Sequence, residues 1–270
     1  MSENYNNELA KSANKHMYIG MINESTLEKE GGPLLIKNSN GIYLHSVNDE
    51  TFIDGISGMY FRNTGHGREE IAKAIYDQIS NVSMNVYAGV TPKSAELAKK
   101  LYEITPGDLS KTFFCQGGSE ANESSLKLAQ AYHVRNGEKG RFKVISRIGS
   151  YHGSTYGTMW LGGHPGFPRT DYQPSPNNII HVRQPDFYRK NYDAENIEEF
   201  TDNCIKEIEE KILFNGPESI SCFIGEPVSQ PLGGVVPHES YWPRVRELCD
   251  RYGILLIFDE VITGFGRIGE

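Results

Sequence analysis

From residue 111 onward the chain alternates short apolar segments with longer amphipathic ones, and this alternation restricts its fold more than any other feature. Five short apolar segments are predicted to be strands, at residues 111–115, 142–146, 179–182, 221–225 and 254–258. Segments with helical periodicity lie between them, at residues 119–136, 194–214 and 239–252, and the pattern allows a short helix at 153–160. Repeated strand–helix units predict an α/β fold, with a mostly parallel sheet and helices on both faces.

The first 110 residues have a different pattern. Residues 1–30 form a polar arm in which the pattern allows a short helix. A hairpin is predicted from residues 34–37 and 41–45, followed by a third short strand at 51–54. A glycine-rich loop at 55–67 precedes two segments with helical spacing, at 68–79 and 92–104.

The charge and hydropathy of the chain exclude several classes of partner. Lys and Arg total 27 and Asp and Glu total 35, so the net charge is 27 − 35 = −8, and no basic block provides a nucleic-acid footprint. No apolar run approaches the ~20 residues of a membrane span, and the polar start does not resemble a secretory signal. The sequence therefore predicts no nucleic-acid or membrane partner.

The four cysteines, Cys115, Cys204, Cys222 and Cys249, are far apart in the sequence. They form no C-x-x-C pair and have no paired histidine motif, so zinc and disulfide bonds are not predicted. Reduced, mostly buried thiols in a cytoplasmic protein are the favoured interpretation.

Ligands bind at the carboxyl ends of strands in parallel sheets, so the residues after each predicted strand are candidates for a site. The first strand is followed by Gln-Gly-Gly-Ser-Glu-Ala-Asn at 116–122, with Ser119 as the predicted helix N-cap. Free N–H groups and the helix dipole at such a position bind anions, most naturally phosphate. An ordinary serine cap with glycines for the turn is an equal alternative.

Single residues follow the other strands. Tyr151 could stack on a planar ligand, although taken alone it is better explained as a core residue. His152 could act as an acid or base, but a hydrogen-bonded structural histidine is favoured. Glu226 precedes a rigid proline and is either a site group or an exposed turn residue. Asp259 follows five apolar residues that predict a central, buried strand, so its carboxylate should be paired with a cation or a ligand.

Two nucleotide-binding alternatives fit poorly. An apolar strand ending in Asp-Glu is typical of P-loop ATPases, but residues 107–112 lack the glycine and the spacing of the phosphate loop. Residues 264–269 match G-x-G-x-x-G, but the helix and the acidic residue that should follow are not present in the sequence.

Five motifs, in order, cover most of the chain from Gly31 onward. They are NTGHG at 63–67, GSEANE at 118–123, YHG at 151–153, GEPV at 225–228 and FDEVITGFGR at 258–267. Together they resemble the class III aminotransferases, the ω-amino-acid and amine transaminases of the type I pyridoxal-phosphate (PLP) fold. The resemblance implies that residues 1–57 belong to a small domain and that residues 58–270 form a PLP-binding large domain, incomplete at its C-terminus.

The resemblance also implies roles for individual residues. Gly118 and Ser119 would hold the cofactor phosphate, and Tyr151 and Val261 would pack on opposite faces of the pyridine ring. Asp259 would pair with the pyridine nitrogen and keep it protonated, so that the ring accepts electrons from a carbanion.

Four further residues match positions near the cofactor or the substrate of similar enzymes. His152 belongs to the YHG motif of the cofactor site, and Glu226 would help to order that site. Tyr60 and Tyr87 would shape the substrate pocket.

The lysine that forms the family's Schiff base has no match here. The last lysine is Lys211, well before Asp259, while Lys127 falls in a predicted helix and Lys143 in a predicted strand. The catalytic lysine is therefore expected beyond Glu270, and the chain is expected to be the N-terminal part of a longer enzyme and inactive by itself.

The predicted activity is PLP-dependent transfer of an amino group from an ω-amino acid or amine to an oxo acid such as pyruvate or 2-oxoglutarate. The resemblance implies a homodimer, and no metal is predicted. The alternatives are an aminomutase or a decarboxylating transaminase on the same scaffold, or a non-catalytic truncated subunit.

Overall fold

The computed structural model describes residues 3–20, 22–83, 89–164, 166, 172, 176–190 and 192–269. The chain divides into two compact units, Met1–Phe113 and Phe114–Glu270. The domain boundary predicted after residue 57 stays a prediction. Tyr87 lies outside the described residues.

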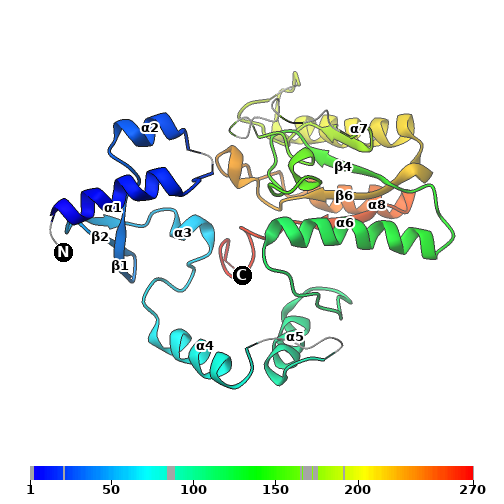
Figure 1. The fold of residues 1–270 in the computed structure, drawn as a ribbon. Coiled ribbons are helices and arrows are strands. Elements are labelled where there is room, and N and C mark those ends of the chain that lie inside the picture. Colours follow the sequence, from blue (N-terminus) through cyan, green and yellow to red (C-terminus); the bar gives the residue numbers. More distant parts are fainter. Residues whose placement is uncertain are drawn as a thin grey trace. The chain divides into compact units, whose positions relative to one another are not determined.

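The first unit combines helices with a small antiparallel sheet (Figure 1). Its helices are α1 (Glu3–His16), α2 (Glu24–Lys29), α3 (Ser57–Tyr60), α4 (Glu69–Asn81) and α5 (Pro92–Ile104). Its strands are β1 (Ile36–Asn40), β2 (Tyr43–Ser46) and β3 (Thr51–Ile53), paired in that order. The predicted hairpin, third strand and two later helices are confirmed.

The second unit contains the predicted strand–helix repeats (Figure 1). Its strands are β4 (Lys143–Arg147), β5 (Ile179–Val182), β6 (Ile220–Gly225) and β7 (Leu255–Phe258). Its α-helices are α6 (Gly118–Arg135), α7 (Ile197–Asn215) and α8 (Tyr241–Tyr252), and three short 3₁₀ helices span Thr158–Trp160, Pro217–Ser219 and Gln230–Leu232.

The four strands form a parallel sheet in the order β5-β4-β6-β7. Alternate side chains point to opposite faces, as the two-residue repeat of a strand requires. Ile145 and Phe223 join the cluster formed with α7 and α8. Val144 and Cys222 join a smaller cluster with α6. Helices therefore cover both faces, as predicted. Cys222 is buried in the smaller cluster, and this burial raises the pKa of its thiol to about 11.

The short helix that the pattern allowed within 153–160 is the 3₁₀ helix Thr158–Trp160. Two expectations about individual elements are wrong. Residues 111–115 form no strand, and Phe113 in this segment is 69% exposed. β7, predicted to be central, lies at one end of the described sheet, where it pairs with β6 and leaves Phe258 44% exposed.

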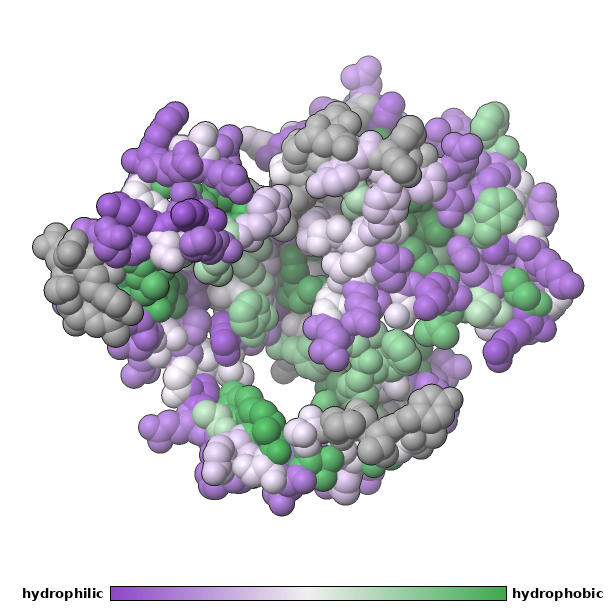
Figure 2. Space-filling model, in the orientation of Figure 1, coloured by the Kyte–Doolittle hydropathy of each residue, from purple (hydrophilic) through white to green (hydrophobic). Residues whose placement is uncertain are grey.

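Two helices of the first unit are mostly exposed. Helices α4 and α5 have no buried residue, so their apolar side chains reach the surface (Figure 2). Among the described residues, no helix combines the length and the hydropathy that crossing a membrane would need.

Candidate functional site

Polar side chains of the second unit gather where β4, β6 and β7 end. The strand order reverses at the pair β4 and β6, because β5 lies beyond one of them and β7 beyond the other. Such a reversal is the usual ligand position in open parallel sheets. Glu226 directly follows β6, and Asp259 directly follows β7.

Asp259 is held by donors on both carboxylate oxygens, and its side chain is only 5% exposed. Oδ2 accepts hydrogen bonds from His152 Nδ1 and Asn122 Nδ2, each at 2.8 Å. Oδ1 accepts the backbone N–H of Val261 at 3.1 Å. Burial alone would raise the pKa of Asp259, but the hydrogen bonds from His152, Val261 and Asn122 outweigh it and hold that pKa below its ordinary value. The network therefore contains a buried, ionised carboxylate.

Glu226 forms a second buried centre with Arg147, the last residue of β4. The Arg147 side chain is 1% exposed and the Glu226 side chain 7%, and Arg147 Nη2 lies 2.9 Å from Glu226 Oε2. Glu226 Oε1 accepts the backbone N–H of Tyr151 at 3.1 Å. The ion pair thus fixes the backbone at Tyr151, directly before His152.

His152 lies between these two carboxylates. Because an ionised carboxylate only accepts, Nδ1 must carry the hydrogen that faces Asp259. Nε2 is buried, has no hydrogen-bond partner among the described residues, and lies 4.0 Å from Glu226 Oε2. The structural role favoured from the sequence is consistent with this position.

The glycine-rich segment before α6 packs closely against the same region. The N-cap of α6 is Gly117, so the predicted cap at Ser119 is wrong. Ser119 lies in the first turn, where its Oγ accepts the N–H of Ser154 at 3.1 Å and keeps its own hydrogen for another acceptor. A Cβ on Gly118 would lie 2.8 Å from Val261 Cγ2, so only glycine allows this approach.

The Ser154 loop is also fixed from α6. Glu123 Oε1 accepts the Thr155 hydroxyl at 2.7 Å and the Gly157 N–H at 2.9 Å. Gly153, at φ +139°, leaves space for Ser119, since a Cβ there would lie 2.6 Å from Ser119 Oγ. The start of α6 and the loop after β4 therefore hold each other in place.

The structure brings most of the predicted site residues together in the second unit through the contacts above. These residues are Gly118, Ser119, Tyr151, His152, Glu226, Asp259 and Val261. Sequence reasoning gave no role to Asn122 or Arg147. A buried arginine at the end of an apolar strand must be paired, and that was the available signal for Arg147.

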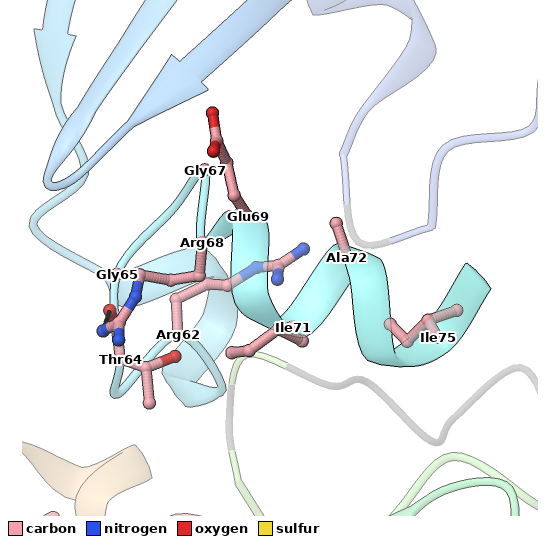
Figure 3. A pocket seen from close by; sticks show the side chains of 9 residues that line it. All are labelled: Arg62, Thr64, Gly65, Gly67, Arg68, Glu69, Ile71, Ala72 and Ile75. Carbon is pink, nitrogen blue, oxygen red and sulfur yellow. Dashed lines mark hydrogen bonds between the residues drawn. The ribbon is translucent and has the colours of Figure 1, made fainter. Parts of the chain in front are cut away.

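The first unit contains the NTGHG motif and Tyr60. Tyr60 ends α3 with a φ of 75°, next to Met59 at 64°, a backbone region that is costly for residues other than glycine. Thr64, Gly65 and Gly67 line an open hollow of about 400 Å³, together with Arg62, whose side chain extends across the first turns of α4 (Figure 3).

Comparison with known proteins decides the family. The profile of the class-III aminotransferases matches residues 26–270. The chain belongs to the class-III aminotransferases. It is 35% identical to the putrescine–pyruvate aminotransferase of Pseudomonas aeruginosa, over 89% of this chain and 53% of that protein. It is 37% identical to the diaminobutyrate–2-oxoglutarate transaminase of Halomonas elongata, over 87% of this chain and 51% of that protein.

Solved structures agree with this class-III aminotransferase assignment. An (S)-enantioselective ω-transaminase from Thermomicrobium roseum superposes with a TM-score of 0.91 at 37% identity, covering 96% of this chain and 57% of that one. The ω-transaminase of Pseudomonas jessenii in complex with PMP gives a TM-score of 0.91 at 35% identity, with the same coverage. The type I fold is thereby confirmed, and the chain spans about half the length of the curated relatives it matches.

Proposed function

We propose that the protein is a PLP-dependent transaminase that moves an amino group from an ω-amino acid or amine to an oxo acid such as pyruvate or 2-oxoglutarate. Family membership and the names of the relatives support the reaction class. The buried, ionised Asp259 carries the proposal, because it lies at the carboxyl end of a strand where parallel sheets bind ligands and where perturbed carboxylates concentrate.

The residues present fit PLP on three observations. Asp259 Oδ1 accepts the backbone N–H of Val261 and can accept a further donor such as a protonated pyridine nitrogen. The N-terminus of α6 offers free N–H groups for a phosphate beside Gly118 and Ser119. The buried Nε2 of His152 has no hydrogen-bond partner among the described residues.

When bound, PLP supplies a ring that accepts electrons from a carbanion at the amine carbon. In this proposal Asp259 holds a proton on the pyridine nitrogen, and Gly118 and Ser119 bind the phosphate. Tyr151 and Val261 pack against the ring, and His152 and Glu226 order the site around it. Tyr60 and Tyr87 belong to the substrate pocket.

The remaining parts of the proposal concern the whole protein. The lysine that holds the cofactor covalently and moves the proton lies beyond Glu270. Residues 1–57 belong to the small domain and residues 58–270 to the large domain. The enzyme is a cytoplasmic homodimer that requires no metal.

The test is an assay of the full-length enzyme with an amine donor and pyruvate or 2-oxoglutarate, together with PLP titration of the enzyme and of the 270-residue chain. Formation of alanine or glutamate is the expected result, with at least about 100-fold loss of turnover in Asp259→Asn. Asp250→Asn, an exposed change on α8, is the matched control. A rearranged amine or released carbon dioxide would instead identify an aminomutase or a decarboxylating enzyme, and absence of any turnover would favour a non-catalytic subunit.

A further inference from the structure

Asn122 makes two hydrogen bonds at the centre of the site, although the reaction proposed above assigns it no role. It lies in the second turn of α6 and is 6% exposed. Its Nδ2 donates to Asp259 Oδ2 and to the backbone oxygen of His152, each at 2.8 Å. Because both partners only accept, they fix which end of the amide faces Asp259.

This orientation restricts where Asp259 can carry a proton. An amide N–H cannot accept a hydrogen bond, so a proton on Oδ2 would point at another hydrogen. Oδ2 is also occupied by His152 Nδ1. Oδ1, by contrast, accepts the backbone N–H of Val261 and has the lone pair available for one more donor.

We propose that Asn122 is a positioning residue that keeps Asp259 ionised and directs its Oδ1 toward the protonated ring nitrogen of the cofactor. The inference rests on the proposed function for the identity of the partner at Oδ1, but not for the ionisation of Asp259. The titratable and charged groups near Asp259 are His152 in direct contact, and Glu226 and Arg147 behind His152.

Two substitutions separate this role from simple packing. N122A removes the donor at every pH. N122D keeps the size of the side chain but places a second carboxyl against Asp259, and two carboxyls at this separation share one proton. The new carboxyl can donate while it is protonated and repels Asp259 once it ionises. N136D makes the same chemical change at the exposed C-cap of α6 and is the matched control.

The experiment measures two quantities in the full-length protein. The first is the titration of the Asp259 carboxyl carbon by NMR without cofactor. The second is the affinity for PLP as a function of pH, followed by fluorescence. We expect a raised pKa of Asp259 in N122A, a raised upper pKa of the carboxyl pair in N122D, and about tenfold weaker PLP binding in N122A at neutral pH. In N122D, PLP binding should weaken as the pH rises, whereas wild type and N136D should not show this dependence.

Unchanged Asp259 titration together with wild-type PLP affinity in N122A would overturn the role of Asn122 while leaving the proposed function intact. Absence of PLP binding to the wild type, with Asp259 titration still altered in the variants, would instead refute the proposed function and support the role of Asn122. If N122A does not fold, the size-matched N122D decides by the same two measurements.

Discussion

The two compact units use helices of similar periodicity in different ways. In Phe114–Glu270, α7 buries six residues and β6 is buried along its whole length. In Met1–Phe113, α4 and α5 bury none, and Leu27 is the only buried apolar side chain among the described residues. Periodicity therefore predicts a helix equally well in both units, but burial depends on whether the unit supplies a second surface to pack against.

The largest expected effect is on the core of the second unit. Phe223→Ala removes a fully buried ring from β6 and should lower the free energy of unfolding by about 3–5 kcal/mol, because a cavity remains. Urea unfolding measures this change. Phe214→Ala, on the exposed side of α7, is the control and should change it by less than about 0.5 kcal/mol. Equal effects of the two variants would contradict the described core.

The second-largest loss of stability is expected from breaking the ion pair between Arg147 and Glu226 at the end of β4. Arg147→Met leaves the Glu226 charge buried without its cation and should cost about 3 kcal/mol of unfolding free energy. Adding Glu226→Gln should restore part of that loss, since no charge remains. Arg246→Met breaks an exposed pair with Asp250 and should cost less than about 1 kcal/mol. A loss in Arg147→Met as small as in this control would mean that the Glu226 charge is solvated.

A smaller effect should appear as pH dependence. The pKa of Asp259 is lower in the folded protein than its ordinary value, so its contribution to stability is complete above the unfolded pKa of about 3.9. That contribution is lost as the pH falls through the folded pKa. Unfolding midpoints measured from neutral to acidic pH should therefore decline less in Asp259→Asn than in wild type. Parallel declines would show that Asp259 titrates normally.

The smallest effect is expected in the first unit. Ile75 of α4 is 54% exposed, so Ile75→Ser should change the free energy of unfolding of the 270-residue chain by less than about 0.5 kcal/mol. Thermal unfolding of the variant tests this directly. A loss comparable to that of Phe223→Ala would remove the contrast between the two units.

Much of the second unit could be predicted from local pattern. Strand–helix alternation located β4 to β7, and the motif after β7 located Asp259 at a strand end. The position of β7 within the sheet could not be predicted, because it depends on which distant strands pair. The hydrogen bonds of Asn122 could not be predicted either, since their acceptors belong to His152 and Asp259, which are far from Asn122 in the sequence. The helix begins after Gly117 and not after Ser119, and the serine hydroxyl instead accepts the N–H of Ser154 in another loop, a contact that local sequence does not reveal.

The hydrogen bond between Asn122 and Asp259 joins residues 137 positions apart in the sequence. Contacts of such separation require a long loop to close before they contribute, and they slow folding. The start of α6 can form locally, but Asp259 reaches it only after β4, β6 and β7 have aligned. The centre is therefore expected to assemble late in folding, and any intermediate that lacks β7 would contain a complete helix terminus but no site.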